Sequence, residues 1–254
     1  MNYDNTRRQL LLMTATITPP AGVPWLDRPD PQIRLKDYEA ALAFYLSDRC
    51  RYIDRLVFVD NSNSDISSLR ELSQNAKKEV EFLSFDGLDH PPQCGRTYGE
   101  FKLIDYAINH SRLLAGMSAC DTFWKVTGRY RVVNLDRLIA TAPERFDIYV
   151  DLRSRRSWCD LRTYACSIHG YKHVFYGHYQ ELNETVVGTP EVYLYGKIRR
   201  LCGEGDSGIV PRFRKVPRVE GICAFRNYEY MKGKYRIIYW CRVLLNSVAP
   251  WLDA

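Results

Sequence analysis

The feature that most constrains this sequence is a regular alternation of apolar runs and amphipathic segments over its first 145 residues. The apolar runs have the composition of strands buried on both faces, and they occupy 9–18, 54–60, 80–85 and 120–128. The segments that follow them carry apolar residues at helical spacing, and they occupy 34–46, 68–78, 99–114 and 134–142. This alternation predicts a mainly parallel α/β sheet with helices on both faces and ligands at the carboxyl ends of the strands.

The pattern changes after residue 145. Two further strands are expected at 146–154 and 161–168, with a hairpin around Ser157 and Trp158, and a helix is expected at 190–201. No internal repeat is present.

Composition excludes several classes of protein. The chain has 254 residues, enough to bury one sizeable core, and its net charge of +6 favours an anionic ligand or surface. It lacks the dense lysine and arginine stripe of a dedicated nucleic-acid binder, so no nucleic acid is expected as a partner. No two of the eight cysteines are spaced Cys-x-x-Cys, which argues against a zinc knuckle. Residues 1–9 are polar and give no signal peptide, so we expect a cytoplasmic protein.

Polar residues follow the second predicted strand in the stretch VFVDNSNSD. Asp60, Asn61 and Ser62 come where the chain leaves the sheet, and Asp65 follows one turn later. A carboxylate or amide at this position can accept a hydrogen bond from a base N–H or a ribose hydroxyl. The alternative is a helix cap and turn, for which Asp, Asn and Ser are the usual residues.

A second candidate site is the stretch QCGRTYGEFKLIDYA. Gly95 and Gly99 bracket Arg96 and Tyr98 just before a helix. Backbone N–H groups at a helix start, together with Arg96 and Lys102, would suit a phosphate. A simple helix-entry loop explains the same residues equally well.

The chain resembles the GT-A glycosyltransferases in the order of three features. These are a strand ending in VDNSNSD, a Gly/Arg loop that opens a helix, and a fourth strand. The likeness covers about residues 10–142 and is strongest to family-2-like bacterial members that build surface polysaccharides such as capsule and lipopolysaccharide. It implies a GT-A-like, Rossmann-type mixed sheet, a nucleotide-sugar donor and a glycan or lipid-linked acceptor. The residues that it assigns to the donor nucleotide are Thr14, Asp60, Asn61, Ser62, Arg96, Tyr98, Gly99, Lys102, Thr127, Gly128 and Arg129.

The resemblance also implies the domain organisation. We expect a single catalytic domain at 1–230, with a nucleotide-binding half at about 8–145 and an acceptor half at about 146–230, followed by a basic amphipathic tail at 231–254.

The end of the fourth strand departs from the family pattern. In GT-A enzymes an Asp-x-Asp sequence there holds a divalent metal on the donor diphosphate, but this chain has Thr127-Gly128-Arg129. A hydroxyl and a cation cannot replace two hard oxygen ligands, whereas a guanidinium can neutralise a diphosphate directly. We therefore expect a metal-independent transferase without a cofactor, in which Arg129, with Lys125 or Arg131, takes the role of the metal. The alternative is that Arg129 pairs with a carboxylate.

An inverting transferase needs a general base for the acceptor hydroxyl. The candidates are Asp147, Asp151, Glu191 and Glu220, of which Asp151 and Glu220 are favoured as catalytic residues. Asp151 ends a predicted strand, and Glu220 lies in a loop that could fold over the donor. Ion pairing with neighbouring arginines is the alternative for both, and a retaining mechanism stays open.

Three histidines lie close together in SIHGYKHVFYGHY. The spacing of His169, His173 and His178 fits no standard metal site, so packing is the expected role and no metal site is predicted. As a functional alternative, Tyr and His faces stack on sugar rings, and His169, Tyr171 and Arg218 are the candidate acceptor-binding residues.

The tail combines basic with apolar residues. Lys232, Lys234, Arg236 and Arg242 are interleaved with an apolar run that is too short to span a bilayer. A basic amphipathic helix with tryptophan suits an anionic membrane interface, so we expect peripheral contact with the cytoplasmic face of the inner membrane. The alternative is a helix that packs on the catalytic domain.

Two other functions compete with glycosyl transfer. A nucleotidyltransferase or another nucleotide-sugar enzyme would share the fold, but the stretch TATITPPAGVP lacks the expected Gly-rich loop with Arg and Lys. A non-catalytic RNA-binding module would need basic and aromatic residues interleaved on one surface, whereas the aromatic residues here mostly follow strand and helix periods.

Overall fold

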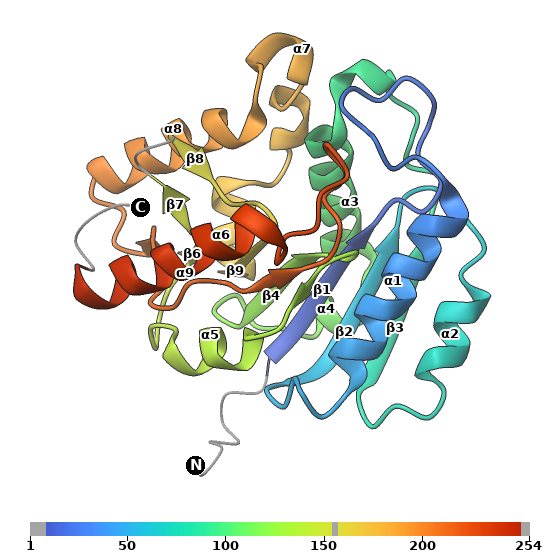
Figure 1. The fold of residues 1–254 in the computed structure, drawn as a ribbon, viewed down its shortest axis with the longest axis horizontal. Helices are drawn as coiled ribbons and strands as arrows, with labels where there is room; N and C mark the ends of the chain where they lie inside the picture. The colour runs from blue at the N-terminus through green and yellow to red at the C-terminus, as the bar shows by residue number, and fades with distance from the viewer. Residues whose placement is uncertain (1–8, 154–156, 250–254) are drawn as a thin grey trace.

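A seven-stranded sheet forms the centre of the molecule (Figure 1). The computed structural model describes residues 9–153 and 157–249, and its strand order is β10-β6-β9-β4-β1-β2-β3. The strands are β1 (Gln9–Ala15), β2 (Ile53–Asp60), β3 (Glu79–Ser84), β4 (Thr122–Thr127), β6 (Ile148–Tyr149), β9 (Thr163–Ser167) and β10 (Ile209–Val210). β1, β2, β3 and β4 are parallel, and only β9 runs antiparallel to its neighbours β4 and β6. The prediction of a mainly parallel α/β sheet with helices on both faces is confirmed.

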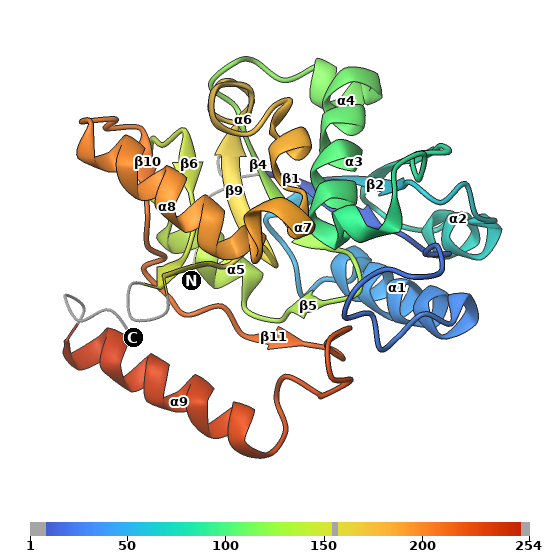
Figure 2. The ribbon, with the colours of Figure 1, turned by 90° about the horizontal axis from the view of Figure 1, so that it is seen from above.

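Helices cover both faces of this sheet (Figure 2). One face carries α3 (Arg96–His110), α4 (Arg112–Ala115), α6 (Ile168–Val174) and α8 (Pro190–Gly203). The other carries α1 (Pro31–Leu46), α2 (Ser67–Ser73), α5 (Leu135–Thr141) and α9 (Gly233–Val248). The remaining short elements are η2 (Pro92–Cys94), η4 (His178–Glu181), α7 (Glu184–Val187), β5 (Arg131–Val132), β7 (Leu152–Arg153), β8 (Trp158–Cys159) and β11 (Val219–Glu220). Alternate residues of the strands therefore enter two hydrophobic cores, one on each face.

Local sequence explains where α1 begins. The Asp30 side chain accepts hydrogen bonds from the backbone N–H groups of Gln32 and Ile33, and Pro31 occupies the first helical position. The helix then buries Tyr38 and Tyr45 against the sheet.

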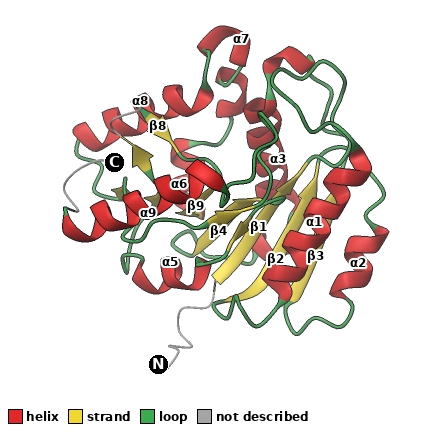
Figure 3. Ribbon diagram, in the orientation of Figure 1, coloured by secondary structure: helices red, strands yellow, loops and turns green. Residues whose placement is uncertain are grey.

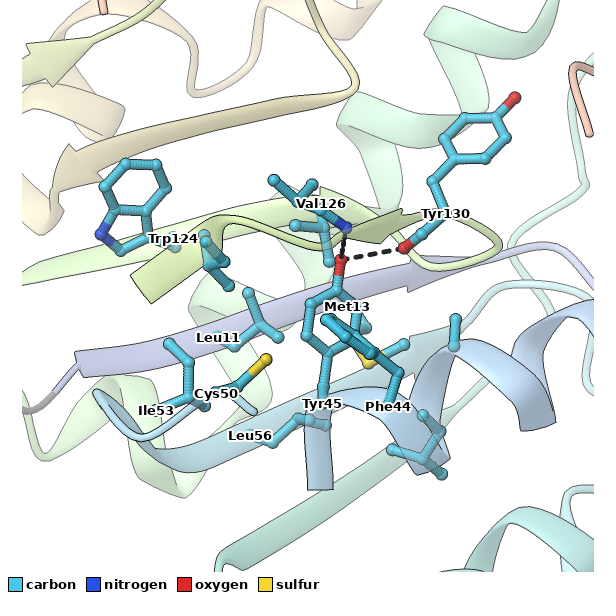
Figure 4. Packing of buried hydrophobic residues seen from close by; sticks show 14 of the residues in the cluster. Leu11, Met13, Phe44, Tyr45, Cys50, Ile53, Leu56, Trp124, Val126 and Tyr130 are labelled. Atoms are coloured by element: carbon cyan, nitrogen blue, oxygen red, sulfur yellow. Dashed lines mark hydrogen bonds between the residues drawn. The ribbon is translucent and has the colours of Figure 1, made fainter. Parts of the chain in front are cut away.

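Tyr45 ties this helix to the chain after β4 (Figure 4). Its buried hydroxyl donates to the carbonyl of Tyr130 and accepts from the N–H of Val132, both at 2.9 Å. Because both partners are backbone groups beyond the end of β4, the bonds fix how the chain leaves the sheet there.

Several boundaries differ from those expected. The predicted helix at 99–114 starts three residues earlier, at Arg96, and is broken at Ser111, which caps α4 and donates to Glu81 of β3. The predicted helix at 68–78 ends at Ser73, and the Lys78 ammonium donates to the carbonyls of Tyr45, Ser47 and Cys50 at and after the end of α1. The hairpin around Ser157 and Trp158 is confirmed by the pairing of β7 with β8, although residues 154–156 lie outside the described residues.

The tail forms α9, which lies on the outer side of the molecule (Figure 3). Residues 1–8 and 250–254, which belong to the predicted domain and tail, lie outside the described residues. Within the described ranges, none of the helices has both the length and the apolar character needed to cross a bilayer. All eight cysteines are free thiols.

Candidate functional site

The carboxyl ends of β1, β2 and β4 bring most of the predicted donor residues to one edge of the sheet. Thr14 is level with Thr127 in the β1–β4 pairing, and Ala15 is level with Asp60 in the β1–β2 pairing. The start of α3 lies against the same edge, since Asn61 donates to the carbonyl of Gly99 at 3.3 Å. These contacts define the candidate site.

The Asp60 side chain binds several backbone groups at this edge of the sheet. Its fully buried carboxylate accepts hydrogen bonds from the N–H of Ile17, from the N–H and hydroxyl of Ser62, and from the N–H of Ser64. In this conformation Asp60 therefore does not offer a free oxygen to a base or ribose, and of the alternative, a helix cap and turn, only the turn is seen, since α2 has no side-chain cap. The Ser62 hydroxyl is equally occupied, since it accepts from the N–H groups of Ile17 and Thr18.

Asn61 is also buried and links three segments. Its side-chain carbonyl accepts from the Thr16 hydroxyl at 2.7 Å, while its amide reaches Gly99. Asn61 thus holds the end of β1 and the first turn of α3 together.

A buried ion pair occupies the centre of the edge. The Lys125 ammonium of β4 lies 2.7 Å from Oε1 of Glu100 in α3, and it also donates to the carbonyl of Leu161. The hydroxyls of Thr14 and Thr127 donate to the same Glu100 oxygen, at 2.8 and 3.0 Å. The other oxygen, Oε2, has no hydrogen-bond partner in the part of the chain that the structure describes, and the Glu100 side chain is 20% exposed. Glu100 therefore has one oxygen free for a ligand.

Burial and ion pairing have opposing effects on the pKa values of Glu100 and of Lys125. Burial alone would raise the pKa of Glu100, but the Lys125 ammonium and the two threonine hydroxyls lower it below its ordinary value. Burial lowers the pKa of the Lys125 ammonium, although Glu100 opposes this. Sequence reasoning missed Glu100. The one signal was Lys125 itself, since a lysine in a buried strand requires a carboxylate partner.

The start of α3 is capped by a carboxylate from another helix. Oε1 of Glu184 in α7 accepts from the N–H of Arg96 at 3.0 Å, and the N–H of Thr97 also bonds to this carboxylate. Gly95 has φ 89°, and a Cβ there would lie 2.1 Å from Glu184. The helix-start N–H groups expected to bind a phosphate are therefore occupied in this conformation by an internal anion. The Arg96 side chain is exposed.

Glu191 completes the site from the first turn of α8. Burial raises its pKa to about 7, a rise that Arg96 opposes and that Glu184 and Glu100 reinforce. A half-buried carboxyl that titrates near neutrality can take up and release a proton under ordinary conditions. Glu191 was among the sequence candidates for the base but was not favoured.

Arg129 points to the opposite face of the sheet from Lys125 and Thr127. It is 8% exposed, packs against Tyr130, and donates weakly to that hydroxyl and to the carbonyl of Ile222, at 3.4 and 3.3 Å. Its Nε has no hydrogen-bond partner, and no carboxylate among the described residues lies within ion-pair distance. The alternative in which Arg129 pairs with a carboxylate is therefore not seen.

The residues at the end of β4 do not fit a divalent metal ion. The Thr127 hydroxyl is committed to Glu100, and Gly128 and Arg129 supply no side-chain oxygen. Within 9–153 and 157–249, no group of three or more His, Cys, Asp or Glu side chains is arranged to hold a metal.

Asp151 is a structural ion-pair partner. Its 6% exposed carboxylate accepts from Arg242 of α9 at 2.8 Å and from Arg153 at 3.4 Å. The small cavity beside it has a volume of about 20 Å³, room for about one water molecule. Two guanidiniums occupy the Asp151 carboxylate in this structure, so the alternative of ion pairing with neighbouring arginines describes it, and not the predicted role as catalytic base.

Glu220 of β11 and Arg218, which precedes this strand, lie together. Their side chains are 3.0 Å apart, and Glu220 is also 3.7 Å from Arg131 of β5. β11 pairs with β5 on the face of the sheet that carries α1, away from Glu100 and Lys125. The structure thus separates both predicted residues from the ion pair of the site.

The remaining predicted residues divide between the edge and other regions. Tyr98 packs against His90 and Tyr179, and Lys102 pairs with Asp89. Tyr98 and Lys102 therefore hold the segment before α3 and the η4 turn against the first two turns of α3.

The predicted acceptor residues on α6 lie elsewhere. β9 leads into α6 at the amino end of β4, since Ser167 is level with Thr122. Tyr171 is fully buried there, and its hydroxyl donates to Asp105 at 2.7 Å. Tyr171 cannot stack on a sugar, so this prediction is corrected. His169 is exposed but stacks near His173 at the edge opposite the site.

Comparison with known proteins gives distant similarities only. No protein-family model matches the chain, and no curated protein sequence matches it. The crystal structure of HddC from Yersinia pseudotuberculosis has 15% identity, covers 65% of this chain and 80% of its own, and has a TM-score of 0.32. The 4-diphosphocytidyl-2C-methyl-D-erythritol synthase from Anaerococcus prevotii has 8% identity, covers 94% of this chain and 99% of its own, and has a TM-score of 0.41. At these values neither structure assigns an activity or confirms the resemblance to GT-A glycosyltransferases.

Proposed function

We propose that this protein is an enzyme of nucleotide-sugar chemistry, and more specifically a glycosyltransferase that moves a sugar to a hydroxyl of a glycan or lipid-linked acceptor. The observation that carries the proposal is the group of charged side chains at the start of α3, where Glu184 caps the helix at Arg96 and the charges of Arg96, Glu184 and Glu100 act on Glu191. Burial raises the pKa of Glu191 to about 7, which suits it to accept a proton near neutral pH. Transfer to a hydroxyl requires such a base.

The proposed reaction is a displacement at the anomeric carbon. The Glu191 carboxylate accepts the proton of the acceptor hydroxyl while that oxygen bonds to the anomeric carbon. The bond from this carbon to the diphosphate oxygen breaks, and its electron pair leaves with the nucleoside diphosphate. Glu100, fixed by Lys125, offers its free Oε2 to a hydroxyl of the donor sugar.

Arg129 is the proposed counter-charge for the diphosphate. The donor then crosses the carboxyl edge of the sheet, because the guanidinium lies on the opposite face from Glu100 and Lys125. Its guanidinium is buried without a carboxylate partner, and a buried cation of this kind is expected to attract an anion. Contact with a diphosphate requires the segment 221–226 to move, because the carbonyl of Ile222 now lies against the guanidinium. The Asp27 carboxylate holds the same segment through the N–H of Arg226.

Nucleotidyl transfer is the second candidate. The observation that favours it is the exposed Arg96 side chain at the start of α3, a cation available to a triphosphate as well as to a diphosphate. In that reaction the attacking sugar phosphate is already an anion at neutral pH, so no base is required.

One variant separates the two functions. UDP-, GDP-, dTDP- and CMP-sugars are first ranked by thermal stabilisation of the protein, and turnover is then measured as the released nucleotide, a nucleoside diphosphate from the first three donors and CMP from the last. Glu191→Gln should lose at least about 100-fold in turnover and keep donor stabilisation, whereas Glu204→Gln, at the exposed other end of α8, should match the wild type. Full activity of Glu191→Gln with a nucleoside triphosphate and a sugar phosphate would establish nucleotidyl transfer instead. If no nucleotide-sugar or nucleotide stabilises the protein, both functions fail.

A further inference from the structure

α9 carries an apolar stripe that the rest of the protein does not cover. None of its residues is buried, and Ile237, Trp240, Leu244 and Val248 are 65%, 52%, 63% and 62% exposed. These positions are spaced by three or four residues, so they lie on one side of the helix. Large apolar side chains gathered in this way on a solvent-exposed surface mark an interaction site.

The opposite side of α9 is fixed to the protein. Arg242 donates to Asp151 at 2.8 Å, and the Asn246 amide donates to the carbonyl of Arg214 at 3.0 Å. Arg242 lies two residues from both Trp240 and Leu244, and Asn246 lies two residues from both Leu244 and Val248. On a helix of 3.6 residues per turn, this spacing places both side chains on the side opposite the stripe. The anchoring therefore leaves the stripe on the outward side of the helix, in agreement with its exposure. α9 itself lies at the outside of the molecule (Figure 2).

The charges on α9 distinguish between a bilayer and a second copy of the chain. Lys234 and Arg236 lie in its first turn, and no residue of Gly233–Val248 is acidic. A second α9 packed on the stripe would bring apolar surface but no acid for these cations. An anionic bilayer supplies both an apolar layer and negative headgroups.

We propose that α9 is a docking helix for an anionic lipid bilayer, lying in the interface plane with its apolar stripe at the boundary between headgroups and acyl chains. The proposal does not depend on glycosyl transfer, since it concerns a surface on the opposite face of the sheet from Glu100 and Lys125.

Vesicle binding tests the proposal directly. The full chain is mixed with vesicles of phosphatidylglycerol and phosphatidylcholine and sedimented at low and high salt. The wild type should sediment with anionic vesicles, less so at high salt, and the double variant Trp240→Ser, Leu244→Ser should bind at least about tenfold more weakly. The matched control Leu72→Ser, Val186→Ser removes exposed apolar side chains from α2 and α7 and should bind like the wild type. Equal binding by both double variants would overturn the proposal.

A fluorescent label reports which surface meets the lipid. Cys241 lies within the stripe and Cys120 near the amino end of β4, and both are exposed. A nitrobenzoxadiazole label on Cys241 in a Cys120→Ser background should shift to the blue and brighten when anionic vesicles are added. The same label on Cys120 in a Cys241→Ser background should stay unchanged. An unchanged Cys241 label, or a dimer that the stripe variant abolishes without any vesicle binding by the wild type, would refute the proposal.

Discussion

The ammonium of Lys125 lies 2.7 Å from Oε1 of Glu100, and residues from β1, β4 and α3 converge on this pair. The lysine is fully buried, so its charge is tolerated only because Glu100 and the carbonyl of Leu161 accept from it. The pair consequently couples the folding of the sheet edge to the position of the one free oxygen of Glu100.

Removing one charge of the Lys125–Glu100 pair should destabilise the protein more than removing both charges. Lys125→Met leaves Glu100 without a cation, and we expect the free energy of unfolding to fall by about 3–5 kcal/mol. The double variant Lys125→Met, Glu100→Gln removes both charges and should recover part of that loss. Urea unfolding followed by circular dichroism measures both, and a double variant no more stable than Lys125→Met would contradict this account.

Turnover should follow the ionisation of Glu191. Because burial raises the pKa of this carboxyl to about 7, kcat/KM of the wild type should rise with pH and level off above neutrality. The pH profile of Glu191→Gln should lack this step. A profile of the variant that keeps the step near pH 7 would assign it to another group.

The free energy of unfolding should also depend on the ionisation of Glu191, but it should fall over the pH range in which turnover rises. A carboxyl whose pKa is higher in the folded state than its ordinary value of 4.5 binds its proton more tightly when folded. It therefore lowers stability as pH rises from about 4.5 to about 7, by roughly 1–3 kcal/mol. Glu191→Gln removes this loss, so its melting temperature should exceed that of the wild type at pH 8 and match it near pH 4.5. A variant less stable at pH 8 would contradict the raised pKa.

The sheet could be predicted from the sequence because its evidence is local. The apolar runs that became β1 to β4 and the helical spacing of the segments between them need no knowledge of distant residues. Glu100 could not be found in this way, since its role depends on Lys125, which lies 25 residues further along the chain. The cap of Glu184 on α3 joins residues 88 apart, for which no local signal exists.

The orientation of single side chains was harder still to predict. Asp60 and Tyr171 have the right residue types for ligand contacts, but tertiary packing turns both inward. Asp151 follows β6 by two residues, yet Arg242, 91 residues later in the sequence, occupies its carboxylate. Residue type and position along a strand therefore indicate where a site lies, and not which oxygen is free.

Asp151 should act as a structural group. Asp151→Asn leaves the Arg242 guanidinium without its nearest carboxylate, so we expect a loss of about 2–4 kcal/mol in unfolding free energy and release of α9. Limited proteolysis should then cut near residue 233 in the variant before the wild type. Turnover of the folded fraction should stay within a few-fold of the wild type. A 100-fold loss in a fully folded variant would restore Asp151 as a catalytic residue.

Arg129 offers a test in which stability and ligand binding move in opposite directions. A buried guanidinium without a carboxylate contributes little to the stability of the free protein, so Arg129→Met should change the free energy of unfolding by less than about 1 kcal/mol or raise it. The same variant should bind the preferred nucleoside diphosphate at least about tenfold more weakly, because the counter-charge is lost. Arg131→Met, two residues along and 41% exposed, is the matched control and should leave affinity unchanged. Calorimetric titration measures affinity and urea unfolding measures stability. An Arg129→Met protein that is several kcal/mol less stable yet binds the diphosphate normally would show that this guanidinium serves the fold alone.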